Sequence, residues 1–405
     1  MSKKKMYRLL AFVLVTFSLL AVVLCYEIKL YSWDKAEKQN SIEGDAASVS
    51  GQAGSITAVP DNKGKDGEEG TGEAINTSKD ETKLPTPAPD DTEKKDINLF
   101  FAGDIYLSDA VAGIYKKQGI EGIVDSKLLA DMKDADIAMV NQEFTFSGGG
   151  KAAEDKQFTF RVNPDYVTAF QDMGIDIVTL ANNHSMDFGT DALKDSFSTL
   201  SAAGISYVGA GNNLAEARNI HYVKEHGKTL AFLAASRVIP VSDWNATSNK
   251  AGMLTTYDPT LLLEDIRTAK KNSDYVIVYL HWGIEREEKP KDYQRSLARQ
   301  YIDAGADMVI GSHPHVLQGV EYYNGKPIIY SLGNYIFYSN IKSTAVLKVT
   351  LDEKLNAKIQ LLPAYAAGGK TQLLEEPEKI REFYEYMKSI SFGVNFEESG
   401  YAMAR

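Results

Sequence analysis

"ADMVIGSHPHVLQGVEYYNGKPIIYSLGN", residues 306–334, places two histidines and a proline between two apolar runs. The runs "DMVI" and "PIIYSL" are short and rich in β-branched residues, which is typical of buried strands. His313 and His315 follow the first run at once, and Pro314 between them stiffens the turn. Two imidazoles are therefore held in different directions at one strand end, which suits ligands for two neighbouring metal sites.

On either side of this stretch, short apolar strands alternate with amphipathic helical segments, the pattern of an α/β domain. Strands are expected at 97–104, 135–143, 175–184, 229–236, 274–283, 306–315 and 326–334. Ligands of open α/β sheets bind outside the carboxyl ends of the strands. Five of the seven strands end in side chains able to bind a metal ion or move a proton. These side chains are Asp104, Asn141, Glu143, Asn182, Asn183, His184, His281, His313 and His315.

Each of these residues also has a structural explanation. A single Asp or Asn after a strand is commonly a helix N-cap or a turn former, and His281 before Trp282 could be a core histidine. As a set they favour chemistry, because four of the six histidines fall at strand ends, whereas His221 and His226 lie in a polar segment. Imidazole, carboxylate and amide ligands without sulfur suit Mn, Fe, Zn or Mg, and a carboxylate bridging two ions suits phosphoryl chemistry.

Five motifs carry a resemblance to a known family: "GDIYL", "NQEFTF", "LANNHSMDFG", "HWGIE" and "GSHPHVLQGVEYYNGKPIIYSLGNYIF". They resemble the poly-gamma-glutamate capsule synthesis protein CapA family, which is similar to the calcineurin-like metallophosphoesterases. The resemblance covers roughly residues 97–362. It implies a metallophosphatase-like fold, a two-sheet sandwich flanked by helices.

The resemblance also implies roles for matching residues. His184 would be the general acid that protonates the leaving oxygen, and Asp187 would orient its ring. Asn334 matches the family's Gly-Asn and could reach the site, while Arg161 in "FTFRVNP" could clamp an anionic substrate. The implied ligands of one or two divalent ions are Asp104, Glu143, Asn183, His281, His313 and His315.

The sequence departs from the phosphoesterase pattern at three positions. The first motif, normally Asp-x-His, has Tyr106 in place of the histidine, and Glu143 replaces the usual bridging aspartate. The carboxylate that normally follows the Asn-His pair is displaced to Asp187, with Ser185 in its place. These departures leave open whether one ion or two bind and whether the site hydrolyses a substrate.

The N-terminus predicts a membrane anchor. Lys3, Lys4, Lys5 and Arg8 precede an uncharged apolar run over residues 9–26, just long enough to cross a bilayer. The alternative is a cleaved signal peptide, but no small-x-small cleavage site follows the run. The basic cluster predicts that residues 1–8 are a cytoplasmic tail and that everything after the span lies outside the cytoplasm.

The rest of the chain divides by composition. Residues 27–95 are rich in Gly, Ser, Pro and charged residues, which predicts a disordered extracytoplasmic linker. Residues 96–365 form the expected CapA-like domain, and the amphipathic pattern of "EEPEKIREFYEYMKSI" predicts a C-terminal helical extension within 366–405. A net charge of −11 excludes a typical nucleic-acid footprint, and Cys25, the only cysteine, excludes an intrachain disulfide.

Two functions remain open at this point. In the first, the chain serves poly-gamma-glutamate capsule synthesis or export beside membrane-embedded partner proteins. In the second, it is a metal-dependent phosphoesterase that acts on an envelope phosphate ester unrelated to capsule. An acidic protein repels a polyanionic product unless metal ions or a local basic groove screen the charge. The family resemblance favours the capsule role and the strand-end residues favour the metal site, so the two claims can fail independently.

Overall fold

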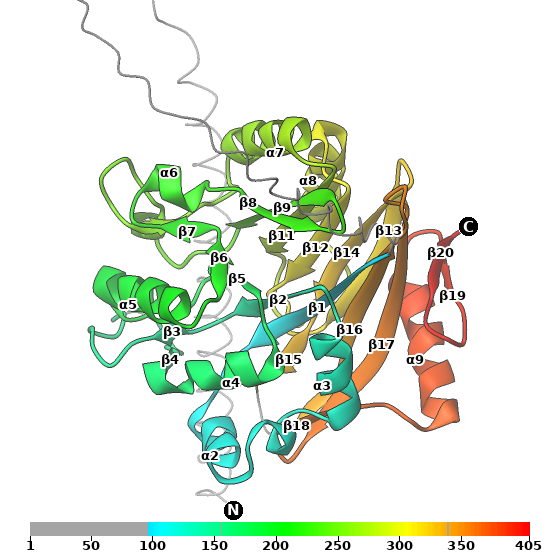
Figure 1. The fold of residues 1–405 in the computed structure, drawn as a ribbon, viewed down its shortest axis with the longest axis horizontal. Helices are drawn as coiled ribbons and strands as arrows, with labels where there is room; N and C mark the ends of the chain where they lie inside the picture. Colours follow the sequence, from blue (N-terminus) through cyan, green and yellow to red (C-terminus); the bar gives the residue numbers. More distant parts are fainter. Residues whose placement is uncertain (1–95, 155, 338–339) are drawn as a thin grey trace, which may run out of the picture. The chain divides into compact units, whose positions relative to one another are not determined.

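The computed structural model describes residues 96–154, 156–337 and 340–405, and there the chain folds as two large β-sheets, three small two-stranded sheets and helices packed against them (Figure 1). The α/β prediction with flanking helices is thereby confirmed. The predicted anchor and linker, residues 9–26 and 27–95, lie outside the described residues. Within the described residues, no helix has the length and apolar character needed to span a bilayer.

The first sheet has eight strands in the described part of the chain, in the order β18-β17-β16-β1-β2-β5-β6, with β15 also paired to β1. Strands β1, β2, β5 and β6 run parallel, whereas β16 and β17 run antiparallel to their neighbours. The strand bounds are β1 Ile97–Ile105, β2 Ile137–Gln142, β5 Ile177–Thr179, β6 Ser206–Val208, β15 Asn334–Ile336, β16 Ile341–Leu351, β17 Ala357–Ala367 and β18 Lys370–Leu373.

The second sheet has six strands among the described residues, in the order β13-β14-β12-β11-β9-β8. Its inner strands β9, β11, β12 and β14 are parallel, so their carboxyl ends share one edge. The strand bounds are β8 His221–Glu225, β9 Lys228–Ser236, β11 Tyr275–His281, β12 Met308–Ser312, β13 Leu317–Tyr323 and β14 Lys326–Leu332.

Successive side chains of a strand point to opposite faces of its sheet, and one of these faces forms the core between the sheets. In β11, Tyr275, Ile277 and Tyr279 join a buried cluster with Phe101 of β1 and Met139 of β2. The residues between them face a separate cluster that includes the helices on the other side of the second sheet. A strand buried on both faces has to be apolar throughout, which explains why these runs do not alternate with polar residues. One face of the second sheet thus shares a core with the first sheet, and its other face is covered by helices.

Helices cover the outer face of each sheet. The first sheet packs on α2 Asp109–Gln118, α3 Ser126–Lys133, α4 Val167–Met173 and α5 Gly189–Ala202. The second packs on α7 Thr260–Asn272 and α8 Asp292–Ala304. Asp125 begins α3 by accepting hydrogen bonds from two backbone amides of its first turn, as an N-cap does.

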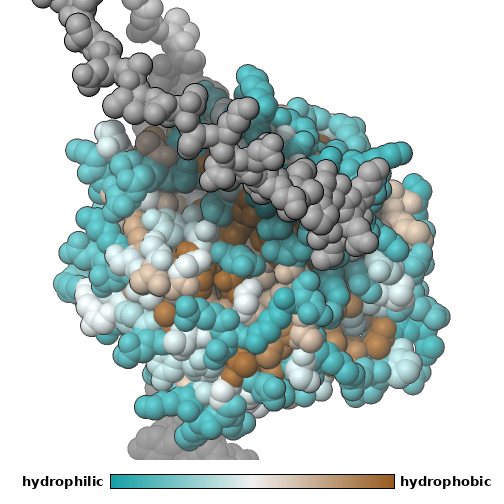
Figure 2. All heavy atoms as spheres, in the orientation of Figure 1, coloured by the Kyte–Doolittle hydropathy of each residue, from teal (hydrophilic) through white to brown (hydrophobic). Residues whose placement is uncertain are grey.

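The predicted C-terminal helix is α9, Pro377–Ile390, and it packs its apolar face on the core between the sheets. A hairpin of β19 Val394–Phe396 and β20 Ala402–Ala404 follows it (Figure 1). The remaining short elements are β3 Thr145–Phe146, β4 Arg161–Val162, β7 Ala210–Gly211, α6 Leu214–Ala217 and β10 Gly252–Met253. Most of the face shown in Figure 2 is hydrophilic, and hydrophobic residues gather in smaller patches towards its middle.

Candidate metal centre

The carboxyl ends of strands from both sheets meet at the candidate site. Asp104 lies near the end of β1, Glu143 follows β2, and Asn183 and His184 follow β5 in the first sheet. From the second sheet, His281 ends β11, and the His-Pro-His segment follows β12. The Tyr279 hydroxyl donates to the Ala102 carbonyl at 2.9 Å, which ties the two sheets together beside the site.

Glycine and unusual backbone conformations shape the His-Pro-His turn. A Cβ at Gly311 would lie 2.2 Å from the Tyr330 carbonyl oxygen and 2.4 Å from the Trp282 ring nitrogen, so this position requires glycine. His313 and His315 have positive φ angles of 99° and 57° on either side of Pro314. Positive φ is uncommon for residues other than glycine, and such strain is concentrated at functional sites.

Glu143 lies at the centre of the cluster. Its Oε1 is 3.6 Å from His281 Nε2, 3.9 Å from His315 Nε2 and 4.0 Å from His184 Nε2. Two sets of ligand atoms lie within 4.8 Å of one another, and Glu143 belongs to both. The first set is Asp104, Glu143 and His281, and the second is Glu143, His313 and His315. Glu143 is thus placed as a carboxylate that could bridge two ions.

The site contains buried polar atoms that no described residue satisfies. Both carboxylate oxygens of Glu143 lack a hydrogen-bond partner among the described residues, and so does Nδ1 of His313. Glu143 is fully buried and His313 is 4% exposed. A buried carboxylate without a partner is costly to the fold. Oxygen and imidazole nitrogen are the donors that Mn, Fe, Zn and Mg accept, so these residues fit a divalent metal ion.

The pKa values of the cluster agree with this assignment. Burial and the nearby Asp104 carboxylate raise the pKa of Glu143 well above its ordinary value. Burial lowers the pKa of His313 to about 3, which keeps that imidazole neutral, as a ligand must be. Burial also acts to lower the pKa of His315, but the Glu143 and Asp104 carboxylates outweigh it and raise that pKa to about 10. The cluster therefore attracts positive charge, which a divalent ion would supply in place of protons.

Two asparagines organise the first sheet's contribution. Asn141 Nδ2 donates to Asp104 Oδ1 at 2.8 Å, and Asn182 Nδ2 donates to Asn141 Oδ1 at 2.9 Å. Asn182 also accepts the backbone N–H of His184 at 3.0 Å. Asn183 Oδ1 lies 2.8 Å from His281 Nε2, which brings these two predicted ligands together. The sequence marked Asn141 and Asn182 as strand-end residues but gave neither a role.

His184 and Asp187 form the predicted pair. His184 Nδ1 lies 2.7 Å from Asp187 Oδ2, and both side chains are buried. Burial lowers the pKa of His184, and the Asp187 carboxylate opposes that shift. Because Nδ1 faces Asp187, Nε2 faces Glu143 and the centre of the cluster.

Two residues that sequence reasoning missed hold this pair in place. Lys156 Nζ donates to Asp187 Oδ1 and to the Asn183 carbonyl, and lies 3.0 Å from His184 Nδ1. The Phe160 ring stacks on His184 with centroids 4.0 Å apart, and its backbone N–H donates to Asp187 at 2.6 Å. Both precede the short strand β4 in a segment without strand or helix periodicity, so no sequence signal marked them.

Tyr106 occupies the position where the phosphoesterase pattern has a histidine. Its ring stacks on Phe160 with centroids 4.0 Å apart and an interplanar angle of 21°, on the other side of the ring system from His184. The three rings form one stack at the edge of the cluster. The substitution thus exchanges a potential metal ligand for packing that supports His184.

The two predicted substrate-binding residues lie in different surroundings. Asn334 Oδ1 is 2.7 Å from His315 Nδ1, so Asn334 orients a predicted ligand. Arg161 is exposed, donates to the Gly149 carbonyl at 2.7 Å and lies over the Phe188 ring. None of these contacts joins Arg161 to the cluster, and its substrate role stays a prediction.

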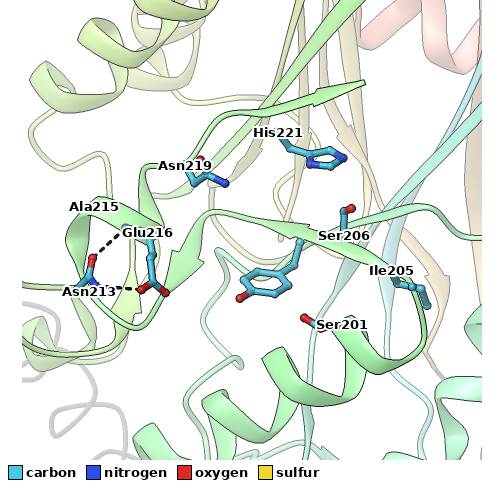
Figure 3. A pocket seen from close by; sticks show the side chains of 10 residues that line it. Ser201, Ile205, Ser206, Asn213, Ala215, Glu216, Asn219 and His221 are labelled. Carbon is cyan, nitrogen blue, oxygen red and sulfur yellow. Dashed lines mark hydrogen bonds between the residues drawn. The ribbon is translucent and has the colours of Figure 1, made fainter. Parts of the chain in front are cut away.

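A hollow of about 800 Å³ lies apart from these residues. It is bordered by the edge strands β6 and β8, by α6 and by the end of α5, and Figure 3 shows Ser201, Ser206, Asn219 and His221 around it. Asn213 and Glu216 are hydrogen-bonded to each other at its rim. No predicted site residue lines it. Its lining combines hydroxyl and amide groups with the Glu216 carboxylate and the His221 ring.

The described domain is similar in sequence to proteins named for capsule synthesis. Residues 98–339 match the family described as bacterial capsule synthesis protein PGA_cap. The PGA biosynthesis protein CapA of Bacillus subtilis (strain 168) is 33% identical over 297 residues, which cover 71% of this chain and 77% of that protein. The capsule biosynthesis protein CapA of Bacillus anthracis is 30% identical over 312 residues, which cover 74% of this chain and 75% of that protein.

One solved structure, described as a novel phosphatase from Mycoplasma pneumoniae, aligns with this fold at 12% identity. The alignment covers 73% of this chain and 99% of that chain, with a TM-score of 0.43. A score of this size carries no inference, so the metal site rests on the residues of this chain alone.

Proposed function

Because this chain belongs to the bacterial capsule synthesis protein family PGA_cap, we propose that it works in the synthesis or export of a poly-gamma-glutamate capsule. In this proposal, residues 9–26 anchor the chain in the cell membrane and the described domain acts outside the cytoplasm. Membrane-embedded synthesis or export proteins are its partners. The printed names of the Bacillus relatives, a PGA and a capsule biosynthesis protein, support this role.

The same domain carries a metal-dependent hydrolytic site of the phosphoesterase type. The observation that carries this proposal is Glu143, a fully buried carboxylate whose oxygens have no partner among the described residues and which lies within 4.0 Å of three imidazoles. When bound, a divalent ion would activate a water molecule and polarise the ester. The residues that would hold it are Asp104, Glu143, Asn183, His281, His313 and His315.

The chain's own residues supply the proton and the orientation. His184 gives the proton on Nε2 to the leaving oxygen, as a general acid. Asp187 accepts from Nδ1 and stabilises the protonated ring, while Phe160 and Lys156 fix its position. Asn334 holds His315 by accepting from its Nδ1, which directs Nε2 towards Glu143.

The enzymatic part is tested on the purified full-length chain with a generic phosphodiester and added Mn, Zn or Mg. Metal-dependent turnover should fall by about 100- to 10,000-fold in His184→Ala, the usual contribution of a general acid. His221→Ala, outside the cluster, should retain the activity of the unaltered chain. If no metal supports turnover, the site serves binding or assembly and not hydrolysis.

The capsule role is tested separately in the producing cell. Deleting the chain should remove the poly-gamma-glutamate capsule, and restoring the unaltered chain should return it. Unchanged capsule after deletion would leave the second hypothesis, a phosphoesterase acting on an envelope phosphate ester unrelated to capsule. If deletion removes the capsule, supplying the cell with the His184→Ala variant shows whether capsule formation requires the hydrolytic step.

A further inference from the structure

Arg237 lies one residue beyond the end of β9, the strand paired with β11, which ends in His281. Its backbone N–H donates to the carbonyl of His281 at 2.8 Å, on the neighbouring strand. Its side chain is half-buried. Leu233 and Ala235, which have the same parity along β9, face the helix-covered side of the second sheet. Arg237 therefore projects towards the helix-covered side. His281 alternates in step with Ile277 and Tyr279 along β11, so it faces the side of the core between the sheets.

The guanidinium of Arg237 is held in one orientation. Its Nη1 donates to the backbone carbonyls of Thr256 at 2.7 Å and Tyr257 at 3.2 Å. Its central carbon lies 5.3 Å from the Tyr257 ring centroid and 4.8 Å from that of Tyr293. The Tyr293 hydroxyl in turn accepts the Gly283 N–H at 2.9 Å, two residues beyond His281. Two rings and two carbonyls thus fix the plane of the guanidinium.

The opposite edge of the guanidinium has no protein partner in the described part of the chain. Among the described residues, the Arg237 side chain donates only through Nη1, to the Thr256 and Tyr257 carbonyls, and no carboxylate forms an ion pair with it. Arg218 shows what the same edge binds elsewhere in the molecule. Its Nε and Nη2 hold the Asp265 carboxylate at 2.8–3.2 Å. A planar fork of N–H donors matches the geometry of a carboxylate or phosphate.

We propose that the Nε and Nη2 edge of Arg237 binds an oxyanion of the substrate, a carboxylate or a phosphate, on the helix-covered side of the sheet edge that carries His281. This inference rests on the proposed function, because it assumes that the reacting group of the substrate lies at the cluster around Glu143. Arg237 and His281 project to opposite sides of one sheet edge, so the oxyanion on Arg237 is a different group from the reacting one. The substrate therefore carries at least two polar groups along an extended chain.

A repeating polyanion meets this requirement. The chain as a whole has a net charge of −11, which repels such a molecule. A cation held in one orientation at the same sheet edge as His281 offsets that repulsion for the part of the substrate that it binds. Two-point attachment also makes affinity rise with ligand length, because the second contact forms within a complex that already exists.

The test measures binding of short γ-linked glutamate oligomers of increasing length, and of inorganic tripolyphosphate, to the purified full-length chain by calorimetry. Arg237→Gln should weaken binding of the preferred probe by about 10- to 100-fold, the loss expected for a pair of charge-assisted hydrogen bonds. It should also abolish the dependence on oligomer length. Arg267→Gln removes the same charge from an exposed position of α7 and should bind as the unaltered chain does.

Arg237→Lys keeps the charge but loses the planar fork, so it should show intermediate affinity even if Arg237→Gln folds poorly. Weakening for glutamate oligomers alone identifies the oxyanion as a carboxylate, and weakening for tripolyphosphate alone identifies a phosphate. Equal affinity of the unaltered chain, Arg237→Gln and Arg237→Lys for both probes would overturn the inference. So would the absence of binding by the unaltered chain.

Failure of the proposed function gives a different result. Repeating the titration after metal removal separates the two claims, because Arg237 needs no metal to bind an oxyanion. An Arg237 effect that persists in a chain without metal content or turnover supports the anion site and rejects the hydrolytic proposal. Metal-dependent turnover together with unchanged binding in Arg237→Gln supports the hydrolytic proposal and rejects the anion site.

Discussion

Glu143 is the residue on which the metal site depends, and its substitution has opposite effects with and without metal. In the stripped chain, Glu143→Gln removes a buried carboxyl group that has no partner and lies near Asp104. The stripped variant should therefore be more stable than the stripped unaltered chain, by about 1–3 kcal/mol. With saturating metal the order should reverse, because the amide is a poorer ligand. Urea unfolding in both conditions measures the two differences.

The matched control for this experiment is Glu382→Gln, the same substitution at an exposed position of α9, which should leave both stabilities unchanged. A Glu143→Gln variant that is less stable than the unaltered chain under both conditions would show that Glu143 has a purely structural role. Equal stabilities with metal present would show that Glu143 is not a ligand.

Single residues of the site could be predicted where a strand end marks them. His281, His313 and Glu143 each follow an apolar run, and parallel strands bring such ends to one edge. Lys156 and Phe160 could not be predicted, because their contacts with His184 form across about 25 residues of sequence and depend on a segment with no periodicity. Tyr106 was identified as a departure from the pattern, but its stacking role required the structure.

At the scale of elements, α9 is an integral part of the core. Met387 is 1% exposed in the cluster between the sheets. Met387→Ala should lower the free energy of unfolding by about 2–5 kcal/mol, the usual cost of removing a large buried side chain. Glu382→Ala, on the exposed side of the same helix, should change it by less than about 0.5 kcal/mol. Similar small losses for both variants would show that α9 packs loosely.

A buried carboxylate joins β13 to α8 and predicts an acid-sensitive contact. Glu321 accepts from Arg295 at 3.2 Å, from Arg299 at 3.1 Å and from the Tyr330 hydroxyl at 2.8 Å. Burial acts to raise the pKa of Glu321, but these three donors outweigh it and hold the pKa below its ordinary value of 4.5.

When folding lowers the pKa of a carboxyl group, that group stabilises the fold fully at pH values above its pKa in the unfolded chain. That stability is lost as the pH falls from 4.5 through the lowered value. The unaltered chain should thus lose more stability than Glu321→Gln between pH 6 and about pH 3. Urea unfolding at several pH values in this range measures the free energy of unfolding of both proteins, with Glu382→Gln as the control. Parallel losses for the unaltered chain and Glu321→Gln would contradict the prediction.

All seven strands expected from the sequence occur in the structure, because strands buried on both faces leave long apolar runs. Strands β16 and β17 were not predicted. Each has only one face towards the core along much of its length, so polar residues such as Lys348 and Gln360 interrupt the apolar pattern. The C-terminal helix was predicted from its amphipathic period, and the hairpin after it was too short to leave a signal.

At the scale of the whole molecule, the candidate ligands connect two sheets. Asp104 lies in β1 and Glu143 directly follows β2 of the first sheet, whereas His281 ends β11 and His313 directly follows β12 of the second. An ion bound by both stabilises the folded state by mass action, by about 2.7 kcal/mol at a concentration 100 times its dissociation constant. Removing metal with a chelator should therefore lower the unfolding temperature, and adding it back should restore it.

The family resemblance implied a two-sheet sandwich, and the apolar pattern predicted the strands, but neither showed which side chains of the two sheets meet. Side chains such as Tyr279 and Phe101 meet only because the two sheets face each other, and no local pattern encodes that pairing. Sequence reasoning could likewise place the site at the strand ends, but it could not show which ligands lie within reach of Glu143.

The most direct test of the account is the metal content of the purified full-length chain, measured by mass spectrometry beside a His313→Ala, His315→Ala double variant. His221→Ala provides a control that removes a histidine outside the cluster. The account predicts one or two divalent ions per chain, lost in the double variant and retained in the control. No bound metal in the unaltered chain, or equal metal in all three proteins, would contradict it.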